Sequence, residues 1–356
     1  MILNLVKKFT NFLRVLFINI FIFILGIIII ELIFGTWLKK NNYSSLLIPR
    51  QQTNIIDNFP YKHETLGIYS RDKHGFRANQ YDLNLVDILI LGGSTTEERD
   101  VDDNKIWTKV FERNLENKLK VINAGIGGQT SYGHKSMFNM WFKNFTDLKP
   151  KFIIVYLGIN DALYLVEYMN NQEMIFNGRQ INSSNRDTLI NLNYIDRVTQ
   201  YFKNNSIFHS IYLILKGNII SNKYKVGYNS TPTSFIAYEE QKPKFLINLE
   251  EKLLITFKEY YQKNLLHILK ESQVYDAELI LVTQTLSNKY WLKSYLETIN
   301  NFTLDFCKIN KLTCFNAESD TLKLKESYFY DGIHTTPEGS RVIGKFIAKK
   351  FNDYYF

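Results

Sequence analysis

The sequence predicts an α/β fold, in which a parallel sheet carries helices on both faces, preceded by one N-terminal transmembrane helix. Two observations predict this architecture. The first is a long apolar run at residues 15–38 that contains very few polar side chains. The second is the alternation, from about residue 80 onward, of short apolar runs with amphipathic stretches. Strands that alternate with helices form parallel sheets, because each helix carries the chain back to the start of the next strand.

The apolar run has about 24 residues, which is enough to cross a hydrocarbon core of roughly 30 Å. A cleaved signal peptide has a shorter apolar region and a small-residue cleavage site, which Phe34–Trp37 does not offer. We therefore expect an uncleaved anchor at residues 15–38, after a flank of residues 1–14, rather than a buried core helix. Basic residues are equal in number on the two sides, so they do not decide the topology. Because the flank is short, we expect a single-pass protein with its main domain on the periplasmic or extracellular side.

Residues 39–80 are expected to be a linker and packing segment, and residues 81–356 to form the main domain. Apolar runs predict its strands at 86–91, 120–123, 152–157, 279–283 and 313–315. Helical spacing predicts helices at 104–118, at 132–145 and from Pro337 to about residue 351. Residues 163–245 are rich in Asn, Tyr and Ser and are too many for a loop, so we expect an insertion there.

Composition excludes several classes of protein. The net charge is +8, but residues 1–40 hold five basic residues and one acidic residue, so half of the excess flanks the apolar run. The rest has no dense basic cluster, which argues against a nucleic-acid partner. The two cysteines, Cys307 and Cys314, are too few for a disulfide scaffold and lack zinc-site spacing. Whether they form a disulfide or stay as two buried thiols is left open.

Two segments predict a nucleophile and its base. Ser94 follows two glycines at the end of the first predicted strand, which permits a tight turn with an exposed hydroxyl. Asp331 lies three residues before His334, just ahead of the last helix. That separation lets the carboxylate turn back onto the imidazole and fix its tautomer, as a general base requires. The plainer alternatives are an ordinary glycine turn, a capping Asp and an incidental surface His.

Two further segments predict donors for an oxyanion. The glycine-rich stretch 125–130 follows the second strand and opens onto a helix, so it can present a backbone amide. It could be a dinucleotide fingerprint, but Thr130 stands where the last glycine belongs. Asn160 follows the third strand and puts a side-chain amide at the same sheet edge, although it could equally form an Asx turn. Taken singly each segment favours the plainer alternative, whereas four in order favour a catalytic site.

These four segments resemble those of the SGNH (GDSL-type) hydrolases, a family named for one Ser, Gly, Asn and His in separated blocks. The blocks match here as Ser94, Gly128, Asn160 and His334, and the resemblance spans about residues 86–350. One departure is Gly93, which stands where the family motif has an Asp, and it puts the packing beneath the serine turn in question.

The resemblance implies a three-layer α/β/α fold with a five-stranded parallel sheet of flavodoxin-like type. It implies ester hydrolysis through an acyl-enzyme, without a metal or a cofactor. Ser94 would be the nucleophile, His334 the acid and base, and Asp331 the residue that orients His334. The backbone amides of Ser94 and Gly128 and the side chain of Asn160 would form the oxyanion hole.

The resemblance and the anchor together lead us to expect a membrane-anchored serine esterase. It would remove a small acyl group, with acetyl as the leading candidate, from a surface or periplasmic polysaccharide. Its partners would be an acylated small molecule or glycan and, through residues 15–38, the membrane. One alternative is an O-acyltransferase that uses the same site with a sugar hydroxyl in place of water. Another is a catalytically silent glycan-binding or scaffold protein. The acyl group, the natural substrate and the oligomeric state are not predicted.

Overall fold

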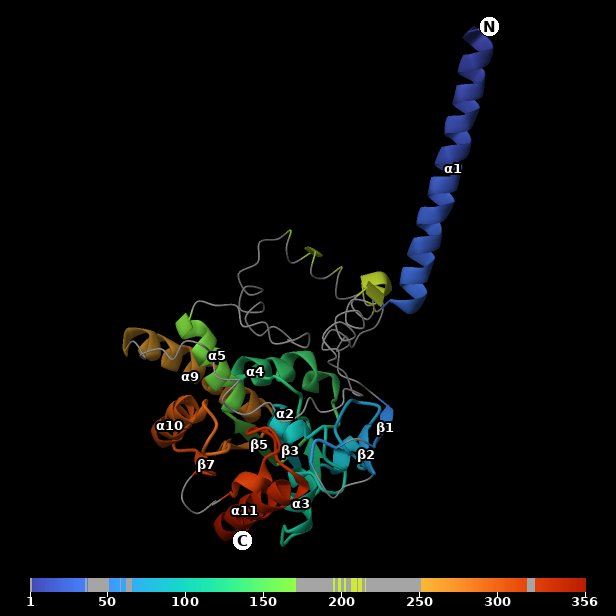
Figure 1. Cartoon of the computed structure of the whole chain (residues 1–356). Coiled ribbons are helices and arrows are strands. Elements are labelled where there is room, and N and C mark those ends of the chain that lie inside the picture. The colour runs from blue at the N-terminus through green and yellow to red at the C-terminus, as the bar shows by residue number, and fades with distance from the viewer. Residues whose placement is uncertain are drawn as a thin grey trace. The chain divides into compact units, whose positions relative to one another are not determined.

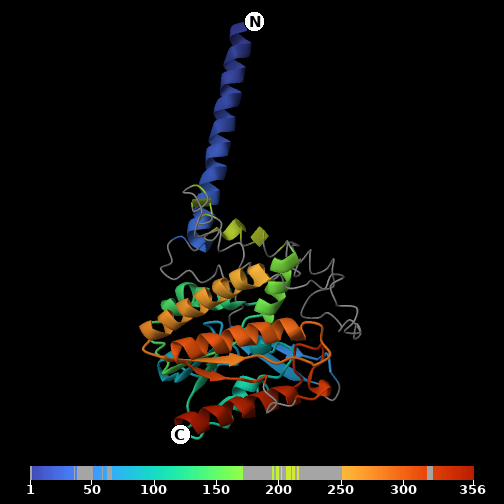
Figure 2. The ribbon, with the colours of Figure 1, turned by 90° about the vertical axis from the view of Figure 1, so that its left-hand side faces the viewer.

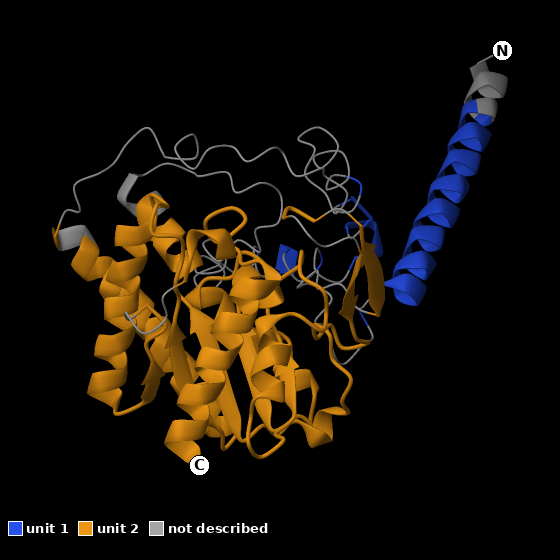
Figure 3. Cartoon of the chain, turned by 60° about the horizontal axis from the view of Figure 1, so that its bottom comes forward, with its two compact units in different colours: residues 1–45, 185–225 blue, residues 46–184, 226–356 orange. Residues whose placement is uncertain are grey.

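The computed structural model describes residues 2–35, 37, 51–57, 59–61, 66–170, 251–318 and 324–356, with residues 195, 198, 199, 202, 206–209, 211, 212 and 215. The chain forms two compact units (Figure 3). One comprises residues 1–45 and 185–225, and the other comprises residues 46–184 and 226–356. The insertion expected at about 163–245 lies mostly outside the described residues.

The first unit contains the long N-terminal helix α1 (Ile2–Phe34), labelled in Figure 1. Its segment Phe9–Phe34 has 26 residues and a mean hydropathy of 2.9, the length and composition of a membrane-spanning helix or of a signal sequence. The helix begins before residue 15 and ends before residue 38, the two limits expected for the anchor. Charged residues such as Arg14 do not interrupt helical backbone geometry, whereas Gly35 ends the helix with its N–H on the carbonyl oxygen of Glu31, 2.8 Å away.

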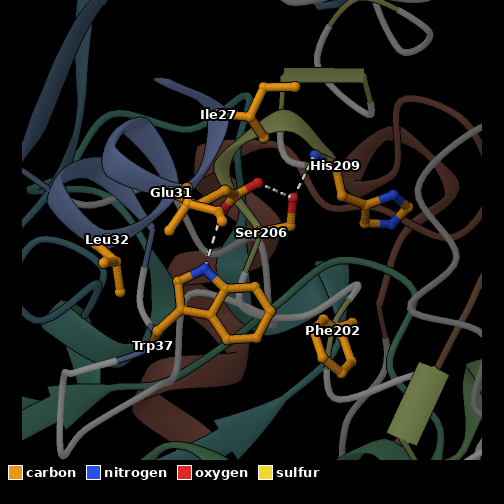
Figure 4. A pocket seen from close by; sticks show the side chains of 8 residues that line it. Ile27, Glu31, Leu32, Trp37, Phe202, Ser206 and His209 are labelled. Atoms are coloured by element: carbon orange, nitrogen blue, oxygen red, sulfur yellow. Dashed lines mark hydrogen bonds between the residues drawn. The ribbon is translucent and has the colours of Figure 1, made fainter. Parts of the chain in front are cut away.

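Glu31 joins the end of α1 to Ser206 and Ile207 of the same unit (Figure 4). Its carboxylate accepts hydrogen bonds from Ser206 Oγ at 2.5 Å, from the backbone N–H of Ile207 at 3.0 Å and from Trp37 Nε1 at 2.9 Å. The Trp37 ring also lies edge-on to Phe202, with centroids 5.0 Å apart. These contacts border an open pocket of about 450 Å³, whose apolar lining consists of Ile27, Ile28, Leu32, Trp37 and Phe202.

The second unit is built on a five-stranded sheet in the order β4-β3-β5-β6-β7, and every neighbouring pair is parallel. The strands are β3 (Ile88–Gly92), β4 (Val121–Asn123), β5 (Phe152–Leu157), β6 (Glu278–Thr283) and β7 (Thr313–Phe315). The expected α/β fold with a five-stranded parallel sheet is confirmed. The chain order reverses at β3, whose neighbours are β4 and β5, and such a reversal opens a crevice at the carboxyl ends of the strands.

Helices cover both faces of this sheet (Figures 1 and 2). One layer consists of α3 (Trp107–Arg113) and α11 (Pro337–Tyr355), and the other of α4 (Ser131–Met140), α5 (Ile159–Asn170), α9 (Glu251–Val274) and α10 (Lys293–Asn310). Alternate strand residues face each layer, since side chains alternate across a strand. Ile88 and Ile90 therefore pack on Trp107, Phe111 and Phe351 in one fully buried cluster.

Three local features differ from the expectations, one of which is that α4 ends at Met140 rather than at residue 145. Helix α3 is shorter than residues 104–118, because the turn before it is organised by Asp102, which accepts hydrogen bonds from the backbone N–H groups of Asn104 and Ile68 at 2.9 and 2.8 Å. The packing segment contains an unexpected antiparallel hairpin of β1 (Gln52–Ile56) and β2 (Gly67–Arg71).

The two cysteines form a disulfide. It joins Cys307, near the end of α10, to Cys314 in β7, with Cα atoms 6.2 Å apart. The bridge therefore spans the turn from the helix to the edge strand of the sheet, and it settles the alternative that the sequence leaves open.

Candidate active site

Ser94 stands at the turn where β3 passes into the short helix α2 (Ser94–Glu97). Gly93 precedes it in an extended conformation (φ −85°) and its carbonyl oxygen accepts hydrogen bonds from the N–H groups of Thr96 and Glu97, both at 3.0 Å. The indole Nε1 of Trp107 donates to the carbonyl oxygen of Thr95 at 3.0 Å and fixes the turn from the side of α3. Ser94 itself stays half-buried, so its hydroxyl is held yet accessible.

His334 lies against Ser94 and Asp331 in the loop before α11. Its Nε2 is 2.7 Å from Ser94 Oγ, and its Nδ1 is 2.6 Å from Asp331 Oδ2. The other carboxylate oxygen of Asp331 accepts the backbone N–H groups of His334 and Ile333 at 2.7 and 3.0 Å. Gly332 takes a positive φ of 86°, which lets the loop turn back on itself. The structure thus brings the predicted serine, histidine and aspartate into one hydrogen-bonded chain.

Within the hydrogen-bonded Ser94, His334 and Asp331, the charge of Asp331 makes the imidazole more basic. Burial alone would lower the pKa of His334, but the Asp331 carboxylate beside the ring outweighs it and raises that pKa. Burial would likewise raise the pKa of Asp331, and the attraction to His334 lowers it instead. The Tyr330 ring stacks on the imidazole, with centroids 5.8 Å apart, and its hydroxyl donates to Asp100 Oδ2 at 3.0 Å. Tyr330 is a neighbour of the imidazole that the sequence analysis missed.

The two other predicted segments border the same turn. A side-chain Cβ placed on Gly93 would overlap Asn160 Nδ2, and one placed on Gly127 would lie 3.8 Å from Ser94 Cβ. Asn160 Nδ2 donates to the carbonyl oxygen of Gln129 at 2.9 Å, which leaves its second N–H for another acceptor. In the described part of the chain, the backbone N–H groups of Ser94 and Gly128 have no hydrogen-bond partner. The N–H groups of Ser94 and Gly128 and the second N–H of Asn160 therefore remain available as the donors that the sequence analysis predicts for an oxyanion.

The glycine loop is held by a buried carboxylate that the sequence analysis missed. Glu97 accepts hydrogen bonds from the backbone N–H of Gly127 at 2.7 Å and from the Tyr69 hydroxyl at 2.9 Å, and it pairs with Arg71 at 3.1 Å. Burial would raise the pKa of Glu97, but the charges of Arg99 and Arg71 hold it far below its ordinary value. No local spacing announces this cluster, because its members come from β2, α2 and the loop after β4.

Two more missed side chains hold the start of α5, which carries Asn160. Gln284, after β6, accepts the N–H of Ile159 at 2.6 Å and donates to Thr95 Oγ1 at 2.7 Å. Asp161 is buried and accepts both the N–H and the hydroxyl of Ser131, at 2.9 and 2.7 Å, at the start of α4. Burial raises the pKa of Asp161 to about 7. Each of these contacts joins segments that follow different strands.

The chain is similar to known proteins in sequence. Residues 90–202 match the model of a family described as the GDSL-like Lipase/Acylhydrolase family, a range that includes Ser94, Gly128 and Asn160. A curated relative, the uncharacterized lipoprotein YqeF of Bacillus subtilis (strain 168), is 33% identical over 75 residues. That match covers 21% of this chain and only 30% of the relative's length.

Solved structures with a similar arrangement include a member of the lipolytic protein G-D-S-L family from Veillonella parvula, with 12% identity and a TM-score of 0.41. It matches 76% of this chain and 98% of its own. Another is Est24, a carbohydrate acetylesterase from Sinorhizobium meliloti, with 11% identity and a TM-score of 0.41, matched over 76% of this chain and 100% of its own.

Proposed function

We propose that this chain, which belongs to the GDSL-like lipase/acylhydrolase (SGNH) family, is a membrane-anchored serine esterase. Its substrate would be a polysaccharide outside the cytosol, from which it removes a small acyl group, with acetyl as the leading candidate. The observation that carries the proposal is the hydrogen-bonded chain from Ser94 Oγ through His334 to Asp331, with links of 2.7 and 2.6 Å. A serine within reach of an imidazole that is itself oriented by a carboxylate is the arrangement of an activated nucleophile.

In the first half of the reaction, Ser94 Oγ attacks the ester carbonyl carbon while His334 Nε2 accepts the serine proton. The carbonyl oxygen becomes an oxyanion, which accepts hydrogen bonds from the N–H groups of Ser94 and Gly128 and from the Asn160 amide. Asp331 holds the imidazole in the tautomer with the proton on Nδ1 and stabilises the imidazolium that forms. Collapse of the intermediate breaks the bond to the alcohol, which leaves with the proton from His334 and so leaves an acyl-enzyme.

In the second half, water replaces the alcohol. His334 takes a proton from the water as the oxygen attacks the acyl carbon, and the same donors hold the second oxyanion. Ser94 then leaves as the alcohol and recovers its proton from His334. The products are the free acid, acetic acid in the proposed case, and the regenerated site. A sugar hydroxyl that entered in place of water would make the same site a transferase.

The compartment is supported by two independent features. The apolar segment Phe9–Phe34 has the composition of an anchor, and the B. subtilis relative is named a lipoprotein. The disulfide between Cys307 and Cys314 is of the kind that persists in oxidising compartments and is rare in the cytosol. The apolar segment favours an enzyme held at the membrane, and the disulfide favours a second unit outside the cytosol, where an acylated polysaccharide would be the substrate.

The proposal is tested on the full-length chain in detergent micelles, with a fluorophosphonate probe and peptide mass spectrometry. We expect labelling at Ser94, loss of it in Ser94→Ala, and a rate about 10²–10⁴-fold lower in His334→Ala, because the general base is gone. Ser327→Ala and His267→Ala change exposed or half-exposed side chains of the same types outside the site and are the controls.

Hydrolysis is measured in parallel as acetate release from an acetylated polysaccharide, with and without a free sugar acceptor. Free acetate alone supports the esterase, whereas an acylated sugar product supports transfer. A folded wild-type chain that is neither labelled at Ser94 nor active on p-nitrophenyl acetate would refute the proposal and leave the glycan-binding alternative.

A further inference from the structure

Glu98 directly follows the helix of the nucleophile and is almost fully buried, with 4% of its surface exposed. We propose that Glu98 is a positioning residue, which locks the His334 loop against the Ser94 helix through its buried carboxylate. The proposal rests on the proposed esterase function and adds to it a residue that touches neither substrate nor reacting atoms.

The carboxylate of Glu98 is surrounded by donors from three segments. Its Oε1 accepts hydrogen bonds from the hydroxyls of Thr335, at 3.0 Å, and of Ser340. Its Oε2 accepts the backbone N–H of Trp107 at 2.5 Å. Burial of an ionisable side chain is tolerated where its polar atoms are satisfied in this way, and it is costly where one of them is not.

These donors connect both partners of the Ser94–His334 hydrogen bond. Thr335 is the neighbour of His334 in the chain, and Ser340 lies in the first turn of α11, which follows the loop. Trp107 begins α3 and its indole supports the serine turn through Thr95. Glu98 itself ends α2 with a positive φ of 46°, a conformation that L side chains adopt only when the surroundings fix it. The carboxylate of Glu98 thus sets the separation of the nucleophile from its base, while Asp331 orients the imidazole and holds the turn of its own loop.

The ionisation of Glu98 bears on this role. Burial raises its pKa to about 7, against the hydrogen bonds from Ser340, Trp107 and Thr335 and the charge of Arg77, which oppose the shift. Arg77 also donates to the carbonyl oxygen of Glu98 at 3.4 Å, and the neutral Tyr156 faces it from β5. The ionised carboxylate accepts all three hydrogen bonds, whereas the protonated form must become a donor at one of them. Full positioning therefore requires the ionised form.

The test compares Glu98→Gln with the wild-type chain, with Glu338→Gln on the exposed side of α11 as the matched control. Glutamine keeps the size of the side chain but cannot ionise. We expect kcat on p-nitrophenyl acetate and the labelling rate of Ser94 to fall about 10- to 100-fold, with little change in KM, because a small displacement of the base is enough for such a loss. The control variant is expected to match the wild type.

The pH profile separates positioning from a merely structural role. In the wild type, protonation of Glu98 lowers kcat in addition to protonation of His334, so the acid limb of log kcat is steeper than one where Glu98 titrates, and in Glu98→Gln its slope stays at one. Hydrogen exchange of the peptide that carries residues 331–340 is expected to be faster in the variant, and this readout does not depend on turnover. Equal kcat, equal limb slopes and equal exchange in the variant and the wild type would overturn the proposal. An inactive, unlabelled wild type would instead refute the esterase, and the exchange data would still decide whether Glu98 holds the loop.

Discussion

The side chain of Asn160 fills the space that a side chain at position 93, just before the nucleophile, would need. This explains why Gly93 departs from the family motif. The backbone at Gly93 has a φ of −85°, which any residue can adopt. The position is restricted by its neighbour instead, because a Cβ there would overlap Asn160 Nδ2. The amide of Asn160 therefore packs directly on the serine turn.

We predict that Gly93→Ala impairs catalysis by displacing Asn160. The expected loss in kcat is about 10²–10³-fold, the effect of removing one oxyanion donor, with KM and the thermal midpoint little changed. Asn160→Ala is expected to cause a similar loss, and the double variant no further loss, because both changes remove one interaction. Steady-state kinetics of the three variants measures this, and losses that multiply in the double variant would contradict it.

The same scale shows what sequence reasoning can find. Ser94, Asn160, Asp331 and His334 could be named because each follows a predicted strand or precedes a predicted helix, and Gly128 was selected within its glycine-rich stretch by the resemblance to the family. Glu97 and Glu98 could not be assigned roles, because the groups that satisfy them lie as far away as Tyr69 and Ser340. A buried carboxylate is recognised only when its distant partners are known.

At the scale of elements, continuous apolar runs predicted the strands well, and β5 and β7 begin and end at the expected residues. Strands buried on both faces are apolar throughout, so their limits coincide with the apolar run. The hairpin β1–β2 gave no such signal, because its strands are half-exposed and short. Helix α3 was predicted too long, because apolar spacing continues through turns that Asp102 and Asn114 organise with their side chains.

The disulfide is an element-scale constraint that we predict to stabilise the fold without affecting catalysis. It closes the turn between α10 and β7, the edge strand, whereas Ser94, Gly128 and Asn160 follow β3, β4 and β5, and Asp331 and His334 lie just before α11. Replacing Cys307 and Cys314 with Ser is expected to lower the free energy of unfolding by about 2 kcal/mol, because the short loop of the unfolded chain is no longer closed. Denaturant unfolding measures the loss, and kcat should be unchanged. An unaltered unfolding midpoint, or a wild-type protein whose thiols are alkylated before reduction, would contradict this prediction.

At the scale of the whole molecule, the site exists only because the sheet brings distant segments together. Its residues lie in four stretches between Ser94 and His334, and three of these follow β3, β4 and β5 at one edge of the sheet. The order of these strands is the reason why the glycine loop and Asn160 border Ser94 from two sides. Parallel connectivity could be predicted from the alternation of strands and helices. Strand order could not, because an apolar run does not indicate which other strands lie beside it in the sheet.

The second unit also contains several buried groups that stabilise the fold when they are protonated. This stabilisation is lost at the higher pH that favours catalysis. Burial raises the pKa of Glu98 from 4.5, and that of Asp161 from 3.8, to about 7 in each case. A carboxyl group whose pKa is higher in the folded state stabilises the fold fully below its unfolded pKa, and this contribution is lost as the pH rises through the folded pKa. The raised pKa of His334 acts in the same direction. Glu97 and Asp331, with lowered pKa values, oppose this trend as the pH falls below about 4.5, and His134, whose pKa burial lowers to about 3, opposes it up to its ordinary value of 6.5.

We therefore predict that the free energy of unfolding, and with it the thermal midpoint, falls between about pH 5 and about pH 8. Glu98 and Asp161 each contribute a loss on the order of 3 kcal/mol to that free energy. Activity should rise over the same interval, because His334 must be neutral to accept the serine proton. Differential scanning calorimetry and initial rates across this interval measure the two trends. Glu98→Gln removes one of the titrating groups, so the fall in its midpoint should be visibly smaller than in the wild type. A midpoint that stays level or rises across this interval would show that these carboxyl groups are not protonated in the folded protein, and that their hydrogen-bond donors compensate burial in full.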